Sequence, residues 1–425
     1  MRILMLTQFY HPIIGGEEQM VQDLSVELAR RGHAVAVATL WHAGLSDHEI
    51  DRNVEIFRIR STTQRAAWLY RETERRHAPP WPDPGATWAL RRVFDQVQPE
   101  VVHAHNWLMY SYLPLTMSRH SRLALTLHDY SWACATRRFM HQGKPCSGPG
   151  FAKCLSCSSH HYGLLKGVPT SLGLRATRTT GRPAIDMFLP VSQAVAVGNG
   201  LTGSRLPYQV IPNFVPDYPE VGPSDIETYI AQLPAGDFVL FVGDLSHDKG
   251  IHILLRAYAE LKAAPPLVLL GRRCSDTPAD FPPNVIFLNT WPHGAVMEAW
   301  RRCSLAVVPS VWPEPFGLVA LEAMISGRPV IASEIGGLSD TVVDGETGLL
   351  VTPGDPGALA SALRRLLADR NLREQMGQAG QLRSELYQAA AVVPRIEQVY
   401  HYMMESSPAY KLHRLASTTQ KISDD

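Results

Sequence analysis

Short apolar runs alternate with amphipathic stretches along the first half of the chain. Residues 2–7 have strand character, and the next segment places Met20, Val21, Leu24 and Leu28 on one helical stripe that ends near Gly32. Further strand-like runs lie at 34–40, 54–59, 101–104, 123–127 and 188–192. Strands that alternate with helices in this way predict a parallel α/β sheet.

The same alternation returns in the second half. A strand-like run at 238–243 precedes a helical stripe over 251–261, and apolar runs follow at 267–271, 285–289, 305–310 and 329–333. Asp355 followed by Pro356 marks the start of a later helix, because Asp caps a helix and Pro suits its first position. A second doubly wound sheet is predicted.

A chain of 425 residues exceeds what one hydrophobic core usually serves, so two domains are expected. We predict two Rossmann-like doubly wound domains, at 1–205 and 226–385, joined by a Pro-rich linker at 206–225. A Cys-rich insertion at about 130–165 belongs to the first domain, and a helix followed by a loose tail fills 386–425. The two sheets are expected to face each other across a cleft, where such folds bind ligands.

Composition narrows the class of partner. Lys plus Arg and Asp plus Glu balance at 40 each, which removes the general attraction of a nucleic-acid binder for phosphate backbones. Neither a membrane-spanning run nor a signal peptide is found in the sequence, and a cytoplasmic location is expected. The segment 64–92 mixes arginines with Trp68 and Trp88; a solvated helix and loop is favoured there over contact with a membrane surface.

The most informative segment is PEPFGLVALEAMISGRPVIASEIGG, in which Glu314 and Glu322 lie eight residues apart. Glu314 precedes a predicted helix and Glu322 lies two turns inside it, so both can face one ligand. The backbone amides of Phe316, Gly317 and Leu318 lie at the helix start, where an anion binds readily. Carboxylates for vicinal hydroxyls and amides for phosphate suit a sugar diphosphate, whereas in isolation such glutamates more often lie on a solvated helix face.

The E-x7-E spacing within E-P-F-G-L-x3-E-A-M, followed by G-x-P-V and G-G, resembles the signature of retaining glycosyltransferase family 4. Related matches extend over nearly the whole chain: G-G-E-E-x2-V at 15–21, T-L-H-D at 126–129, V-S at 191–192, I-P-N-F-V at 211–215 and V-G-D-L-S-x-D-K-G at 242–250. The resemblance implies the GT-B fold, a nucleotide-sugar donor and a hydroxyl-bearing acceptor.

By this resemblance Glu314 contacts the donor sugar, Glu322 takes the ribose hydroxyls and Lys249 neutralises the diphosphate. Gly16 lets a loop of the first domain approach the donor phosphate, and His128 lies beside the sugar. In the absence of the family pattern, a hydrogen-bonded core histidine and an exposed loop lysine are the plainer interpretations of His128 and Lys249.

One position departs from the family. The family usually has an arginine where this chain has Asp244, so part of the cationic phosphate clamp is missing or supplied elsewhere, with Arg272 and Arg273 as candidates. No Asp-x-Asp metal pair lies at a comparable strand end, so transfer without a divalent cation and without a cofactor is expected. Front-face attack is preferred to a covalent intermediate on Glu314, and His103 and His105 are further cleft candidates.

Four cysteines cluster in one Gly- and Pro-rich segment with the spacing C-x11-C-x7-C-x2-C: Cys134, Cys146, Cys154 and Cys157. Such a loop has little apolar content, and a tetrahedral structural zinc ion would hold it together. An iron–sulfur cluster and unligated thiols are the alternatives. The segment follows His128 and is therefore expected to border the acceptor side of the cleft.

These features predict a retaining hexosyltransferase that uses a nucleotide diphosphate sugar, with UDP as the commoner carrier. A nucleotide-sugar epimerase, a phosphorylase and a GT-B sugar-binding protein without transferase activity are the alternatives on the same plan. A dinucleotide-dependent dehydrogenase is disfavoured, because the first strand is not followed by Gly-x-Gly-x2-Gly.

Overall fold

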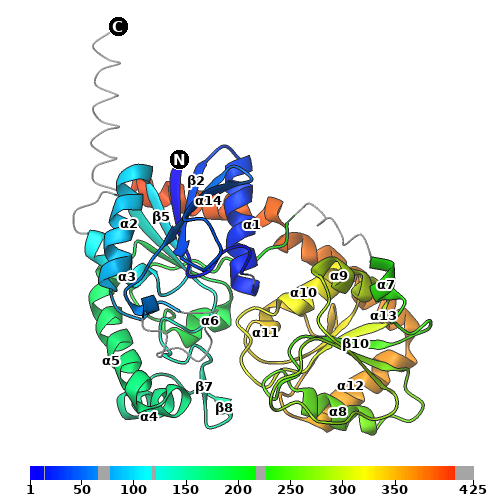
Figure 1. The fold of residues 1–425 in the computed structure, drawn as a ribbon. Helices are drawn as coiled ribbons and strands as arrows, with labels where there is room; N and C mark the ends of the chain where they lie inside the picture. Colours follow the sequence, from blue (N-terminus) through cyan, green and yellow to red (C-terminus); the bar gives the residue numbers. More distant parts are fainter. Residues whose placement is uncertain (14, 66–76, 117–120, 217–225, 407–425) are drawn as a thin grey trace.

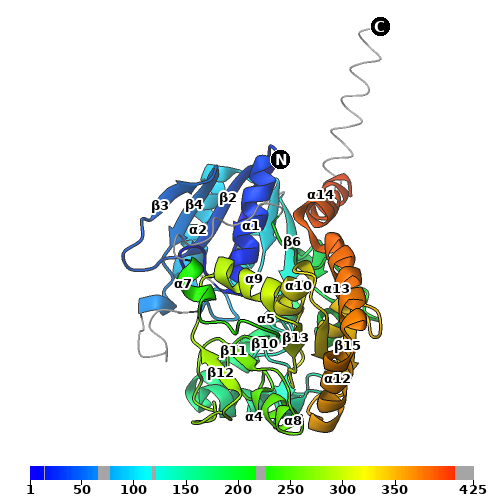
Figure 2. The same ribbon diagram turned by 90° about the vertical axis from the view of Figure 1, so that its right-hand side faces the viewer.

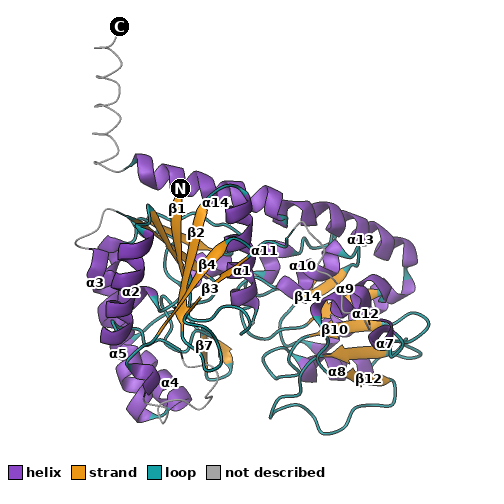
Figure 3. Ribbon diagram, turned by 45° about the horizontal axis from the view of Figure 1, so that its top comes forward, coloured by secondary structure: helices purple, strands orange, loops and turns teal. Residues whose placement is uncertain are grey.

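The computed structural model describes residues 1–13, 15–65, 77–116, 121–216 and 226–406. It contains two α/β domains side by side, each built on a parallel sheet with helices on both faces (Figures 1 and 3). The predicted fold class is confirmed. Part of the Arg- and Trp-containing segment, part of the proposed linker and the polar tail after 406 lie outside the described residues.

The first sheet has seven strands in the order β3-β4-β2-β1-β5-β6-β9, parallel except for the edge pair β3 and β4. Their bounds are β1 Arg2–Leu6, β2 Ala34–Leu40, β3 His48–Asp51, β4 Val54–Ile59, β5 Val101–Ala104, β6 Arg122–Leu127 and β9 Met187–Pro190. The helices of this domain are α1 Gly16–Arg30, α2 Pro84–Val97, α3 Met109–Thr116, α4 Phe151–Tyr162, α5 Leu164–Gly181 and α6 Gln193–Gly198. A small hairpin, β7 Met140–His141 and β8 Lys144–Pro145, extends towards the second domain (Figure 1).

The second sheet has six parallel strands in the order β12-β11-β10-β13-β14-β15. Their bounds are β10 Val239–Val242, β11 Leu267–Leu270, β12 Val285–Leu288, β13 Leu305–Val308, β14 Val330–Ser333 and β15 Gly348–Val351. The helices are α7 Ile226–Ile230, α8 Ile251–Ala259, α9 His293–Arg302, α10 Leu318–Ile325, α11 Leu338–Thr341, α12 Pro356–Ala368 and α13 Arg370–Ser384. The predicted cap of α12 is present, since the Asp355 carboxylate accepts from the amides of Gly357 and Ala358.

The last helix, α14 (Ala389–Glu405), leaves the second domain and packs on the first (Figures 1 and 2). One apolar face of α14 joins the core of the first domain, with Val392, Val393, Ile396, Val399 and Tyr400 all buried. Glu397, on the same helix, accepts hydrogen bonds from Arg31 at 2.7 and 3.0 Å and lies 2.8 Å from a ring nitrogen of His33. In the described part of the chain, no helix is both long and apolar enough to cross a membrane.

The chain passes between the domains twice, and the two passages pair with each other. The Val215 amide donates to the Tyr387 carbonyl at 2.9 Å, and the Ala389 amide donates to the Val215 carbonyl at 3.0 Å. The outgoing and returning segments therefore form one two-stranded connection beside the interface.

Candidate donor site

The loop after β10 is held against the end of β13. Gly250 has φ +74°, and a Cβ atom there would lie 1.9 Å from the Pro309 carbonyl oxygen, so only glycine fits. The Val311 amide donates to the Asp248 carbonyl at 2.9 Å. These contacts bring the segment that carries Lys249 onto the segment that leads to Glu314.

Lys249 and Glu314, predicted to share one ligand, are in direct contact. The Lys249 ammonium lies 2.6 Å from Glu314 Oε1, and the Ser310 hydroxyl donates to the same oxygen at 2.7 Å. The Glu314 side chain is 9% exposed and that of Lys249 31%, so the cation is the more accessible of the pair. The Lys249 ammonium also lies 5.4 Å from the centre of the Trp312 ring.

The start of α10 is shaped by closely packed glycines. Gly317, with φ +90°, precedes the helix, and Gly337 donates its amide to the Glu314 carbonyl at 2.6 Å. A Cβ atom on Gly336 would lie 2.2 Å from that carbonyl oxygen. The G-G pair after β14 therefore lets the backbone fold against the Glu314 segment and leaves the helix start at this end of the sheet.

The first domain meets this helix start through Gly16. A Cβ atom on Gly16 would lie 3.5 Å from Leu318 Cδ1, so the first residue of α1 lies against the first residue of α10. Phe316 and Leu318 also pack into the core of the first domain. Two helix N-termini, one from each domain, thus converge where the sequence predicted a phosphate-binding site.

Glu322 lies just over one turn into α10, not two turns as predicted, because the helix begins only at Leu318, and it has different partners from Glu314. Its carboxylate lies 3.2 Å from a ring nitrogen of His293 and accepts from the Trp300 indole N–H at 3.3 Å. Trp300 is fully buried, which fixes the carboxylate against α9. The two glutamates border one helix start without sharing a contact, so a ligand that uses both must extend from the Lys249 side to the α9 side.

Arg272 and Arg273 have separate roles. The guanidinium of Arg272 makes a two-pronged ion pair with Asp244, at 2.8 and 3.2 Å, between the ends of β10 and β11. Arg273 donates to the carbonyls of Pro278 and Ala279 and lies over the rings of Phe281 and Phe287. Arg272 is therefore positioned beside the residue that departs from the family, whereas Arg273 is committed elsewhere.

His128 follows β6 and contacts a second histidine. Its Nε2 lies 3.0 Å from Nδ1 of His105, and desolvation by burial lowers the pKa of His128 to about 4. Burial likewise places the pKa of His105 well below its usual range. Both rings are neutral at neutral pH, and Nδ1 of His128 is buried.

His103 lies in the interior of the first domain. It is fully buried, with Nδ1 2.6 Å from the Tyr400 hydroxyl of α14 and Nε2 2.7 Å from the Thr126 hydroxyl. His105 hydrogen-bonds to His128, whereas the hydrogen bonds of His103 are to Tyr400 and Thr126.

Sequence reasoning missed Glu17, in the first turn of α1. Burial first, and then the charges of Glu18 and Asp129, raise the pKa of Glu17 to about 8. The Asn106 side-chain amide donates to Glu17 Oε1 at 2.6 Å. A carboxyl group that stays protonated near neutral pH, close to Asp129 and Gly16, is typical of a functional cleft. The only signal in the sequence was its place within G-G-E-E.

The four clustered cysteines are brought into one region of the first domain. Cys154 and Cys157 lie one turn apart on α4, and Cys146 follows the β7–β8 hairpin. The Gly150 amide donates to Cys154 Sγ at 3.4 Å, and the Cys157 thiol donates to the Met140 carbonyl at 3.6 Å. Burial raises the pKa of the Cys157 thiol, and the other three thiols raise it further. None forms a disulfide, and no three metal-binding side chains among the described residues have the spacing of a metal site.

Family models match both domains of the chain. Residues 14–216 match the model described as Glycosyltransferase Family 4, and residues 227–383 match the model described as Glycosyl transferases group 1. The second match contains Lys249, Glu314 and Glu322, and the first contains Gly16 and His128. Together the two matches include the residues that the sequence assigned to the site.

Known proteins and solved structures resemble this chain over one or both domains. Glycogen synthase of Mycobacterium tuberculosis is 26% identical over 90% of each chain, and D-inositol 3-phosphate glycosyltransferase of Corynebacterium diphtheriae is 36% identical over 38% of this chain and 41% of that protein. The structure of sucrose-phosphate synthase from Thermosynechococcus elongatus matches with a TM-score of 0.72 and 22% identity, over 95% of this chain and 99% of that one. The structure of Anabaena Alr3699/HepE in complex with UDP-glucose matches with a TM-score of 0.66 and 20% identity, over 94% of this chain and 99% of that one. The two family matches, read with the two-domain fold, identify this chain as a glycosyltransferase of the GT-B fold.

Proposed function

We propose that the chain is a retaining hexosyltransferase of family 4 that takes its sugar from a UDP-linked donor and transfers it to a hydroxyl group. The observation that carries this proposal is the Lys249–Glu314 contact of 2.6 Å at the start of α10, with Gly16 of the first domain beside it. A donor diphosphate placed there meets one ammonium group and two helix N-termini, and Glu314 lies next to the attached sugar.

The proposed transfer occurs on one face of the sugar. The acceptor oxygen bonds to the anomeric carbon on the side from which the diphosphate leaves, and the acceptor proton passes to the departing phosphate oxygen. Negative charge grows on the diphosphate during this step, so preorganised positive charge lowers the barrier. Lys249 and the α10 amides supply that charge, and we propose that the transfer needs no divalent cation. Glu322 holds the ribose, and His128 lies beside the sugar.

Uridine is favoured as the base by the structurally similar Alr3699/HepE, whose complexes contain UDP and UDP-glucose. The test is a thermal-shift series with UDP, GDP and ADP at equal concentration, because a true ligand stabilises the folded state by mass action. UDP is expected to raise the Tm most. If no nucleoside diphosphate stabilises the protein, the proposal is wrong. Release of UDP from a UDP-sugar only when an acceptor is present then separates transfer from epimerisation.

We also propose that Cys134, Cys146, Cys154 and Cys157 bind a structural zinc ion. Four thiols from one loop and one helix, already close enough to interact, match the ligand set of a closed zinc site. Among the described residues the thiols do not have the spacing of a metal site, so they would have to move closer to bind the ion. The ion would supply folding energy to the loop and takes no part in transfer. We place the protein in the cytoplasm, where such thiols stay reduced.

A further inference from the structure

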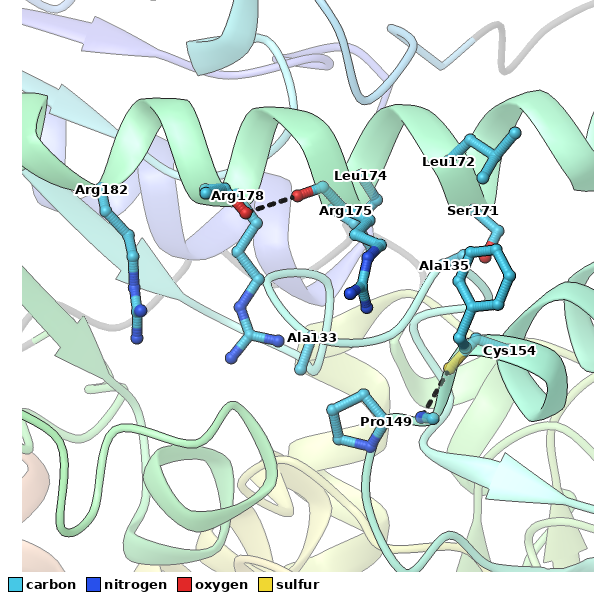
Figure 4. A pocket seen from close by; sticks show the side chains of 13 residues that line it. Ala133, Ala135, Pro149, Cys154, Ser171, Leu172, Leu174, Arg175, Arg178 and Arg182 are labelled. Atoms are coloured by element: carbon cyan, nitrogen blue, oxygen red, sulfur yellow. Dashed lines mark hydrogen bonds between the residues drawn. The ribbon is translucent and has the colours of Figure 1, made fainter.

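A cavity of about 290 Å³ lies in the first domain, and neither Lys249 nor either site glutamate lines it. It is bounded by α5, by the segment around Ala133 and by the segment that runs from Pro149 to Cys154 (Figure 4). Its volume is near the lower end of the roughly 300–1,000 Å³ typical of small-molecule pockets. It therefore suits a ligand of about the size of a monosaccharide derivative.

Three arginines from α5 and its C-terminal end point into this cavity. Arg175, Arg178 and Arg182 are spaced by three and four residues, which places them on one helix face. Figure 4 shows their side chains extending from the helix towards Ala133 and Pro149. The lining contains no aspartate or glutamate, and no ion pair joins these arginines to another described residue.

Two of the three guanidinium groups have contacts and keep unused donors. Arg178 donates one N–H to the Asn199 carbonyl at 3.1 Å and lies 5.9 Å from the centre of the Trp132 ring. Arg175 lies 5.5 Å from the centre of the Phe151 ring. A guanidinium has five N–H donors, so most of them are free. The buried indole N–H of Trp132 also has no acceptor among the described residues.

The charges in this cavity are uncompensated. Burial lowers the pKa of Arg178, and the nearby charge of Arg182 lowers it further. Arg178 is partly buried, whereas Arg175 and Arg182 are exposed at the mouth of the cavity. Like charges repel, and an oxyanion that accepts from their planar forks relieves the repulsion. Phosphate and carboxylate groups have this chemistry, whereas a neutral sugar does not.

The cavity wall is connected to the segment that carries His128 through one buried residue. Asn199 donates its side-chain amide to the Asp129 carbonyl at 2.9 Å and accepts from the Ala133 amide at 3.1 Å. Its own carbonyl is the acceptor for Arg178. A ligand bound by the arginines would thus be positioned by the same segment that begins with His128.

We propose that this cavity binds the phosphate or carboxylate group of a small ligand, and, resting on the proposed transferase function, that this ligand is an anionic sugar acceptor. The donor is bound by Lys249, Glu314 and Glu322 of the second domain, so the first domain is where the acceptor is expected. The arginine forks would orient the acceptor through its charged end and leave a hydroxyl group free to react.

The test uses the full-length protein saturated with UDP, so that the donor phosphate site is already filled. Inorganic phosphate, glucose 6-phosphate, glucuronate and glucose are titrated by calorimetry and by thermal shift. The variants are R175Q/R182Q, which keeps the partly buried Arg178, and the matched control R91Q/R205Q, which removes two exposed arginines elsewhere in the domain. Circular dichroism checks that both variants are folded.

We expect wild-type protein to bind at least one anionic probe at least tenfold more tightly than glucose. R175Q/R182Q should lose at least tenfold in that affinity, and R91Q/R205Q should keep it. Preference for glucose 6-phosphate assigns a phosphate group, and preference for glucuronate assigns a carboxylate. Equal affinity for glucose and the anionic probes, or unchanged binding in R175Q/R182Q, would overturn the inference. UDP stabilisation is recorded separately, so a failed donor site is distinguished from a failed anion site.

Discussion

Arg138 of the first domain forms an ion pair with Asp248 of the second. Asp248 directly precedes Lys249, and Arg138 lies within the Cys-rich segment, just before the β7–β8 hairpin. The first domain therefore holds the loop that carries the proposed diphosphate ligand. Through this contact, the Cys-rich segment of the first domain helps to position the loop that carries Lys249.

Replacing Arg138 with alanine is expected to raise the KM for the donor by roughly two- to fivefold, because a partly exposed ion pair contributes at most about 1 kcal/mol. The measurement is donor KM at low ionic strength. The charge-swapped variant R138D/D248R should recover part of the loss, and R91A should have wild-type KM. Failure of the swap, together with a wild-type KM for R138A, would show that the contact does not support the donor loop.

Replacing Lys249 with alanine is expected to weaken UDP binding by roughly tenfold to a hundredfold, since a hydrogen bond to a charged group contributes about 1.5–3 kcal/mol. Isothermal titration calorimetry with UDP measures this directly. Lys262, an exposed lysine of the same domain, provides the control K262A, which should bind UDP as wild type does. Equal affinities for K249A and K262A would remove Lys249 from the site.

The two glutamates are expected to differ in what they recognise. E322A should lose the preference for UDP over 2′-deoxy-UDP, because its carboxylate is proposed to read the ribose hydroxyls. E314Q should keep UDP affinity and that preference but lose most transfer activity. Binding of both nucleotides to wild type and to each variant gives the comparison. An E322A protein that still discriminates against the deoxynucleotide would contradict the assignment.

Stability should depend on the ionisation of Glu17. The unfolded chain releases this proton near the ordinary glutamate value of 4.5, whereas the folded protein keeps it until about pH 8. The folded state therefore binds more protons in that window, and the free energy of unfolding falls as pH rises from about 4.5 to 8. E17Q, which still accepts from Asn106, should raise the Tm above that of wild type by several degrees at pH 8.5 and by much less at pH 5. The exposed Glu55 gives the control E55Q, which should show no such difference.

Zinc removal should destabilise the first domain without a direct effect on chemistry. Protein purified without added metal is expected to contain about one zinc per chain by elemental analysis, since four thiolates complete one tetrahedral site. C154S/C157S should lose the metal and show a lower Tm, whereas C274S should retain it. Dialysis against EDTA, at a strength that leaves this zinc bound, should not reduce transfer activity. Metal-free wild-type protein of unchanged stability would end the zinc proposal, and activity that requires added magnesium would refute cation-independent transfer.

Most of the buried strands could be predicted from the sequence. The runs 34–40, 54–59 and 101–104 coincide with β2, β4 and β5, because strands with a buried face are rich in β-branched and other apolar residues. The edge strand β3, with the sequence HEID, was missed because it is largely polar and pairs only with β4. β15 was missed because GLLV is too short to stand out from its flanks.

The candidate site could be predicted from the sequence only in part. The family resemblance assigned Lys249 and Glu314 to one donor site, and the two side chains are in contact. The partners of Glu322 on α9, the pairing of Asp244 with Arg272 and the contact of His105 with His128 were not accessible, because each joins side chains from separate elements. The arginine cavity was also missed, because its wall combines α5 with the segments around Ala133 and Pro149, which only the fold brings together.

The return of α14 to the first domain has a consequence for how the protein is made. The apolar face around Val392, Ile396 and Tyr400 completes a core whose other members are translated at least 175 residues earlier, the latest of them being Phe214 near the domain crossing. On the ribosome, the second domain can finish folding while the first still waits for its last helix. Chains released before that helix is made should therefore be open to chaperones and proteases, even with every residue of both sheets in place.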